Sequence, residues 1–144
     1  MSRICKNSPD HFCYICGEFT FSKHRKSLTP LIRKAYELYF DCKVGDQDKS
    51  WAPHMCCFNC DTKLRNWMNG KKRSMGFAVP MIWREPKNHI DDCYFCAVPP
   101  ILEGVYQRRK SIAYPSLASA IRPVPHDEAL PIPECPRSFG EYLA

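Results

Sequence analysis

The sequence has no run of about 18 apolar residues, the length that a membrane-spanning helix requires. The stretch MSRICKNSPDHF at its start also lacks the apolar segment of a secretory signal peptide. We therefore expect an intracellular protein, nuclear or cytoplasmic, that has no membrane partner. Its thiols are then expected to meet a reducing compartment, where paired cysteines more often bind metal or do redox chemistry than form disulfides.

The motifs that indicate common catalytic sites are also missing. The chain has no glycine-rich phosphate loop, no nucleophile elbow and no pair of carboxylates at a meaningful spacing. The acidic stretch VGDQDKSWAPH lacks the EF-hand pattern and its closing Glu, so calcium is not expected. We therefore predict that the protein is not an enzyme and has no small-molecule substrate.

Cysteine and proline, by contrast, are unusually frequent. The 144 residues include 10 Cys and 13 Pro, both above average usage. Lys and Arg number 21 against 15 Asp and Glu, and the formal net charge of +6 permits contact with nucleic acid without requiring it. The length suits one ordinary domain or two very small ones.

Six of the cysteines form three Cys-x-x-Cys steps, which are Cys13–Cys16, Cys57–Cys60 and Cys93–Cys96. Two such steps supply the four thiolates that a tetrahedral Zn²⁺ takes. The first two steps therefore predict one zinc site, whose ligands are Cys13, Cys16, Cys57 and Cys60. Cys56 is an alternative to Cys57, but Cys57 gives the tighter two-residue knuckle, so we favour it.

Redox chemistry and a disulfide framework are the alternatives to zinc at these thiols. A thioredoxin-like pair lies between a strand and a helix, and no helix is predicted directly after Cys16. Disulfide frameworks belong to secreted proteins. A structural zinc supplies about 10–16 kcal/mol of apparent binding energy, against on the order of 3 kcal/mol to close a loop of roughly 40 residues. Zinc is therefore the favoured interpretation.

Residues 30–43 are predicted to form an amphipathic helix between the first two steps. Thr29 suits the N-cap and Pro30 the first helical position. Apolar residues follow at helical spacing as far as Cys42, which would complete the apolar face, and Gly45 follows the helix.

A second helix is predicted to begin at the second step. Cys57, Cys60 and Leu64 share one face with Trp67 and Met68, and a glycine at position 70 ends the pattern. The positive end of this helix dipole would favour thiolates.

This order of cysteines and helices resembles the zinc-finger-associated domain of insect transcription factors. The resemblance covers residues 11–70 and rests on CYIC at 13–16, a helix, and CFNC at 57–60 opening another helix. It implies one zinc held by the four cysteines, and homodimers, although no counterpart of the family's long C-terminal dimer helix follows residue 70. A THAP-type domain has similar spacing but has His at the position of Cys60, so it fits less well.

Over its whole length the chain also resembles a set of uncharacterised invertebrate proteins. They share the blocks KVGDQDKSWAPH, FAVPMIWREP, DCYFC and AIRPVPH. Some of them are associated with mobile-element or transcription-factor-like sequences, so the resemblance implies work in the nucleus.

A second metal site is predicted around the third step, where His89 lies four residues before Cys93 and Cys96 follows. A structural zinc needs a fourth ligand, and we favour His126 over Cys135. The alternative is a surface imidazole beside two buried thiols. A catalytic deaminase-type zinc is disfavoured because Asp91, rather than Glu, follows the histidine by two residues and no P-C-x-x-C is present. We therefore expect two zinc ions.

The remainder of the chain is predicted to be extended. Residues 77–83 form a short strand that Pro80 restricts to a sheet edge, and a weaker strand candidate lies near 104–114. Eight of the 13 prolines fall in residues 97–144, which predicts an arm either draped over the domain or loose.

The expected fold is a small α+β zinc-stabilised domain with two main helices, short strands and a Pro-rich C-terminal arm. Residues 1–74 would form the four-cysteine module. Residues 75–136 would form a second zinc-binding segment packed on the first, and residues 137–144 a tail.

Basic clusters offer a possible contact with nucleic acid. The candidates are Lys63, Arg65, Lys71, Lys72, Arg73, Arg108, Arg109 and Lys110, with a further cluster at residues 23–26. Such residues contact phosphates, but they also occur in solvated loops. We therefore expect a non-catalytic interaction module that contacts a protein partner or a second copy of itself in a nuclear or transcription-related assembly. The alternative is a nucleic-acid-binding zinc module.

Overall fold

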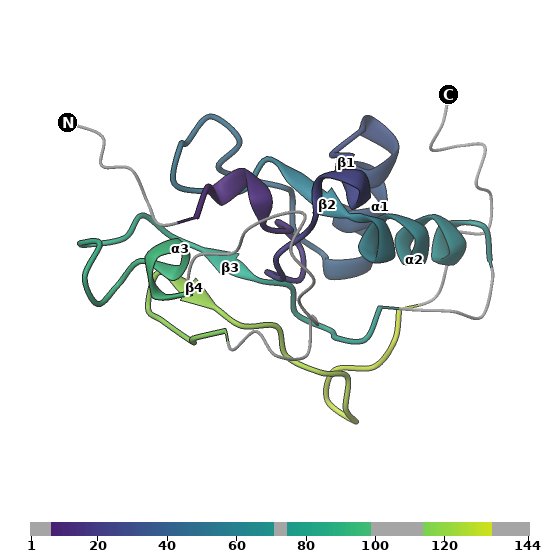
Figure 1. Cartoon of the computed structure of the whole chain (residues 1–144). Coiled ribbons are helices and arrows are strands. Elements are labelled where there is room, and N and C mark those ends of the chain that lie inside the picture. Colours follow the sequence, from purple (N-terminus) through teal and green to yellow (C-terminus); the bar gives the residue numbers. More distant parts are fainter. Residues whose placement is uncertain (1–6, 71–74, 99–113, 134–144) are drawn as a thin grey trace.

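The computed structural model describes residues 7–70, 75–98 and 114–133. These residues form a small α+β fold with two main helices and two short antiparallel sheets (Figure 1). The elements are two 3-10 turns, η1 (Pro9–His11) and η2 (Ser22–His24), then β1 (Arg25–Ser27), α1 (Pro30–Phe40), β2 (Met55–Cys57), α2 (Phe58–Met68), β3 (Ile82–Trp83), α3 (Tyr94–Ala97) and β4 (Ala120–Ile121). No helix in the described ranges is long and apolar enough to cross a bilayer.

Helix α1 begins as predicted but ends early. The hydroxyl of Thr29 accepts a hydrogen bond from the backbone N–H of Ile32 at 3.3 Å, and Pro30 occupies the first turn. The helix stops at Phe40 because Asp41 adopts a left-handed conformation, with φ of 56°, which Asp tolerates better than most residues. Cys42 therefore lies beyond the helix and is exposed, so the prediction that it completes the apolar face is wrong.

Helix α2 follows the prediction closely. Cys57 is its N-cap, and the Cys57 sulfur accepts a hydrogen bond from the backbone N–H of Cys60 at 3.4 Å. The helix ends at Met68, followed by Gly70 with a positive φ of 78°. The ring of Trp67 meets Tyr39 of α1 edge to face, with centroids 4.9 Å apart, so the two helices are packed together.

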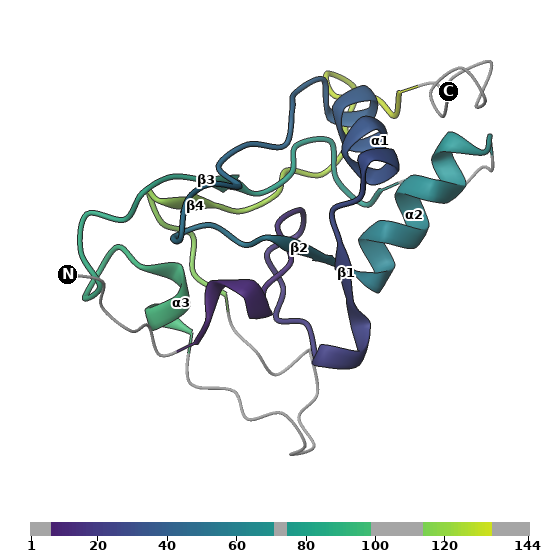
Figure 2. The same ribbon diagram turned by 90° about the horizontal axis from the view of Figure 1, so that it is seen from above.

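Strand β2 leads into the second cysteine step and is held on one side by β1 and on the other by the first step, since the backbone N–H of Tyr14 donates to the Met55 carbonyl at 2.8 Å. They pair antiparallel with Arg25 opposite Cys57 and Ser27 opposite Met55. Figure 2 shows this pair lying beside the start of α2. No strand was predicted at either segment, since neither shows an alternating apolar pattern.

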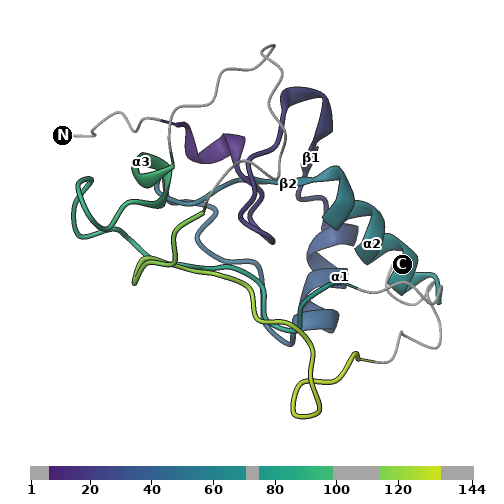
Figure 3. The same ribbon diagram turned by 60° about the horizontal axis from the view of Figure 1, so that its bottom comes forward.

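The Pro-rich arm is draped over the domain in its described part. Strand β4 pairs antiparallel with β3, placing Ile121 opposite Ile82, and Val124 forms an isolated bridge with Val79. The predicted strand at 77–83 is thus reduced to two residues and a bridge. Figure 3 shows the arm running alongside this segment. The weaker candidate near 104–114 lies almost wholly outside the described residues.

An aromatic cluster fills the core between the first and third cysteine steps. The Trp83 ring stacks on Phe95 with centroids 5.4 Å apart, and meets Tyr94 edge to face at 5.3 Å. Phe12 contacts both Tyr94 and Phe95. The indole N–H of Trp83 donates to the carbonyl of Tyr14 at 2.8 Å. The cluster therefore packs the two cysteine-rich turns against each other.

Candidate metal centres

The first centre consists of Cys13, Cys16, Cys57 and Cys60. All four are buried, and their sulfur atoms all lie within 4.8 Å of one another. The Cys16 and Cys57 sulfurs are 3.9 Å apart. A tetrahedral zinc with Zn–S bonds of about 2.3 Å has sulfurs about 3.8 Å apart. The donor set and its spacing therefore fit zinc.

Backbone N–H groups point at these sulfurs. Cys13 accepts from the N–H of Ile15 at 3.3 Å and of Cys16 at 3.4 Å, as Cys57 accepts from Cys60. Gly17, with φ of 78°, lets the chain turn back after the first step, and its N–H donates to the Cys13 carbonyl at 2.9 Å. Donors aimed at sulfur stabilise the thiolate form that a metal requires.

The pKa values of Cys57, Cys16 and Cys60 are shifted by the neighbouring thiols. Hydrogen bonds with Cys13, and then with the other two thiols, lower the pKa of Cys57 well below its ordinary value. Hydrogen bonds involving Cys13, together with burial, raise the pKa of Cys16 and Cys60. Four buried thiolates would repel one another, so all four ionise together only around a cation that compensates their charge.

Cys56 is not part of this cluster. It is fully buried, and its side chain is absent from the group of four sulfurs. Burial raises the pKa of the Cys56 thiol far above its ordinary value, which keeps it neutral. The structure therefore brings Cys57, and not Cys56, to the first centre.

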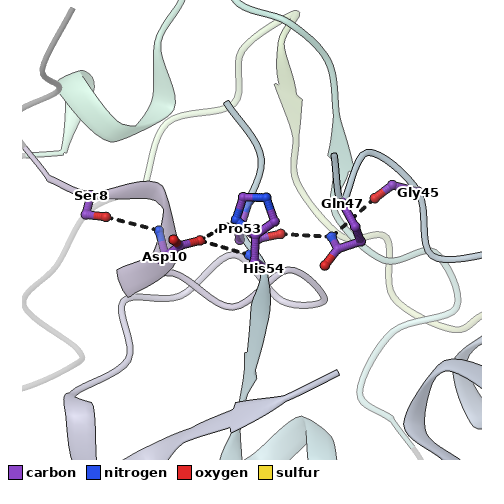
Figure 4. A network of polar contacts seen from close by, with 6 residues as sticks. All are labelled: Ser8, Asp10, Gly45, Gln47, Pro53 and His54. Carbon is purple, nitrogen blue, oxygen red and sulfur yellow. Dashed lines mark hydrogen bonds and ion pairs between the residues drawn. The ribbon is translucent and has the colours of Figure 1, made fainter. Parts of the chain in front are cut away.

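A polar network fixes the chain ahead of the second knuckle (Figure 4). One oxygen of the Asp10 carboxylate accepts from the backbone N–H of His54 at 3.1 Å and lies 2.6 Å from Nδ1 of the same residue. The amide of Gln47 donates to the carbonyls of Gly45 and Pro53 at 3.3 and 3.0 Å. The loop before β2 is thereby tied to η1, which immediately precedes the first knuckle.

The second centre consists of His89, Cys93 and Cys96. One ligand atom from each lies within 4.8 Å of the others, and Nδ1 of His89 is 3.7 Å from the Cys96 sulfur. Cys93 is buried at the start of α3, while the other two are partly exposed. Asn88 shapes the preceding loop, because its side-chain oxygen accepts from the N–H groups of Ile90 at 2.8 Å and Asp91 at 2.9 Å. The predicted His-x3-Cys-x2-Cys residues thus converge.

His126 does not join them, contrary to the prediction that it supplies the fourth ligand. Its Nε2 lies 2.8 Å from the hydroxyl of Tyr39 in α1, and its Nδ1 lies 3.1 Å from the carbonyl of Leu130. Both ring nitrogens therefore have partners at a different place in the fold. Cys135, the other predicted candidate, lies outside the described residues.

Two of the predicted nucleic-acid-binding residues can be placed. Lys63 is exposed, while Arg65 is paired with Asp61 at 3.0 Å. The others, Lys71, Lys72, Arg73, Arg108, Arg109 and Lys110, lie outside the described residues. Sequence reasoning missed Phe58, whose ring is 49% exposed and lies 5.6 Å from the Lys26 ammonium group. The sequence did contain a signal for it, since Phe58 lies between the two cysteines of the CFNC step. The cysteines point to the metal centre, and the first residue of the helix faces outward.

No protein-family model, curated protein or solved structure matches this chain. The class of protein is therefore defined by the fold and the two clusters alone. A small α+β fold built around a four-cysteine cluster, with a second His/Cys cluster, is consistent with a zinc-binding module.

Proposed function

We propose that this chain is a non-catalytic zinc-binding interaction module that holds two zinc ions. The observation that carries the proposal is the first centre, where the sulfurs of four buried thiols all lie within 4.8 Å of one another. A four-thiolate zinc has no open position for water or substrate, so such a metal organises the fold and does not react.

The module is proposed to act in a nuclear or transcription-related assembly, through contact with a protein partner or a second copy. The resemblance of residues 11–70 to the zinc-finger-associated domain supports this assignment. Ile82 and Val124 support it too, because their side chains are 38% and 39% exposed on neighbouring stretches of the β3 and β4 segments. Ile82 also lines, with Phe40, a groove of about 280 Å³. Exposed apolar residues that adjoin a groove suit a protein contact.

Metal content tests the proposal. We expect two zinc equivalents per chain in the wild type and one in Cys93→Ser, because the first centre does not involve that residue. His126→Ala is the matched control and is expected to keep both equivalents, since its ring contacts Tyr39. Elemental analysis of the purified full-length variants gives the answer. A wild type without any tightly held transition ion would refute the zinc module, and light scattering that finds only monomer at high concentration would remove self-association.

Nucleic-acid binding is the second candidate function, and the surface around Phe58 favours it. The Lys26 ammonium group lies over the face of the exposed Phe58 ring, and the His24 ring is 6.4 Å from it. An exposed aromatic ring beside a cation can stack a base while the cation contacts its phosphate. Lys63, five residues after Phe58 on α2, is also exposed.

If this surface binds single strands, Phe58→Ala should weaken the complex by about 1–3 kcal/mol, roughly 5- to 150-fold, through loss of stacking. Affinity for a labelled oligonucleotide, measured by fluorescence anisotropy at low and moderate salt, should fall steeply as salt rises. Ile90→Ala is the control, because that side chain is 85% exposed on a different loop. Absence of wild-type binding at low salt would eliminate this second function.

A further inference from the structure

The two metal centres are connected by residues that adjoin their cysteines in the sequence. Trp83 makes the first connection. Its indole N–H donates at 2.8 Å to the carbonyl of Tyr14, which lies inside the first cysteine step. Its ring stacks on Phe95, inside the third step, with centroids 5.4 Å apart. One side chain therefore contacts a turn of each centre. The inference that follows rests on the proposed function, since it takes both centres to hold zinc.

The second connection is a hydrogen-bond network around the hydroxyl of Tyr94. This residue directly follows the ligand Cys93 and is only 1% exposed. Its hydroxyl donates to the carbonyl of Gly17 at 2.7 Å, and Gly17 directly follows the ligand Cys16. A single buried hydroxyl thereby joins the residue after a ligand of the second centre to the residue after a ligand of the first.

Arg122, which directly follows β4, completes the network. Its Nη1 donates to the Tyr94 hydroxyl at 2.9 Å and to the carbonyl of Cys16 at 3.0 Å. Because the hydroxyl accepts from Arg122, its own proton is available for Gly17. A buried hydroxyl that loses its acceptor is unfavourable, so Tyr94 is held in place only when the Cys16–Gly17 turn has formed.

We propose that this network couples the two metal centres, and that Tyr94 is the positioning residue through which zinc at one centre raises the affinity of the other. Each knuckle is either closed around a metal or open. Zinc at the first centre closes the Cys16–Gly17 turn and fixes the carbonyl to which Tyr94 donates, and this holds the adjoining Cys93 ready for the second ion.

The coupling is favourable because the network is shared. The first ion to bind already removes most of the conformational freedom of the network, so the second ion binds to a turn that is partly ordered. By linkage the effect is reciprocal, and the second ion stabilises the first centre by the same factor. The protein is therefore expected to gain and lose its two ions together.

Tyr94→Phe in the full chain tests the coupling, with Tyr39→Phe as the matched control. Both substitutions remove a hydroxyl from a buried ring, but that of Tyr39 bonds to Met75 and His126, which adjoin no ligand of either centre. Competition with a chromophoric chelator measures the affinity for each zinc equivalent. We expect the second equivalent to bind about 5- to 150-fold more weakly in Tyr94→Phe, the usual size of a coupling between sites. Tyr39→Phe should stay close to the wild type.

Hydrogen exchange separates coupling from a general loss of stability. The backbone N–H of Gly17 donates to the Cys13 carbonyl at 2.9 Å, so its exchange rate reports on the first knuckle. In the wild type and in Tyr39→Phe, adding a second zinc equivalent to protein that already holds one should slow this exchange. In Tyr94→Phe the second equivalent should leave the rate unchanged, although both ions bind.

Arg122→Met is a second variant that keeps the inference testable if Tyr94→Phe does not fold. It removes the donor to Tyr94 and to the Cys16 carbonyl from a half-buried side chain, and it should weaken the second equivalent in the same direction. The coupling is overturned if the wild type binds two equivalents while Arg122→Met and Tyr94→Phe both behave like Tyr39→Phe. That result would leave the zinc module standing. A wild type that binds fewer than two equivalents would contradict the proposed function, and this inference with it.

Discussion

Replacing Cys57 by Ser is expected to unfold the protein, whereas replacing the adjacent Cys56 is not. Cys57 is one of the four sulfurs of the first centre and also the N-cap of α2. A structural zinc supplies about 10–16 kcal/mol of apparent binding energy, which matches or exceeds the roughly 5–15 kcal/mol by which whole domains are stable. Circular dichroism on heating, with metal analysis of the same sample, measures the effect.

Cys56→Ser is the matched control at the neighbouring position. The Cys56 sulfur is buried but lies outside the cluster. The substitution therefore replaces a buried thiol by a buried hydroxyl, which should lower the free energy of unfolding by about 1–3 kcal/mol. It should retain two metal equivalents and a cooperative melting transition. A chelator added to the wild type should reproduce the Cys57→Ser result. Equal melting curves for the two variants would mean that metal does not hold the fold together.

The second large effect is expected from Gly17→Ala, with a loss of about 2–5 kcal/mol. Gly17 has φ of 78°, where a side chain costs about 1–2 kcal/mol. A Cβ there would stand 2.7 Å from the Met81 sulfur and 2.8 Å from Nη1 of Arg122. That guanidinium donates to the Cys16 carbonyl at 3.0 Å and to the Tyr94 hydroxyl at 2.9 Å. Disturbing these bonds adds about 1–3 kcal/mol.

Gly76→Ala provides the comparison, because a Cβ at that position meets nothing within 4 Å. Its effect should stay within about 0.5 kcal/mol. Urea unfolding of both variants, with metal retained, measures the difference in free energy of unfolding. If Gly17→Ala proves as stable as Gly76→Ala, the close packing of Met81 and Arg122 on this turn is wrong.

The features that were predicted correctly depend on local signals. Thr29 and Pro30 fix the start of α1 because an N-cap and a proline act on the turn that contains them. The two-residue spacing of Cys57 and Cys60 suffices to place both sulfurs on one side of a turn, and the structure brings them to the Cys13–Cys16 step. Spacing also brings His89 to the third step.

The features that were missed depend on contacts between distant segments. The pairing of Arg25 with Cys57 joins residues far apart in sequence and leaves no alternating pattern in either. The position of His126 is set by the Tyr39 hydroxyl, which no spacing rule could anticipate. Helix α1 ends early because Asp41 adopts a left-handed backbone conformation. The apolar pattern in the sequence continues at helical spacing beyond this residue, so it did not indicate the true end.

Met81 and Arg122 cover the Cys16–Gly17 turn, and their late position in the sequence affects folding during synthesis. A ribosome completes the ligands of the first centre when it adds Cys60, but Met81 and Arg122, which pack on that turn, are added later. Nascent chains that have released Cys60 from the ribosome, but not yet Met81 and Arg122, should therefore expose a turn that the complete fold covers. Such chains should attract chaperones or aggregate. Translation that stops before Arg122 would yield an aggregation-prone chain even when the first centre holds its metal ion.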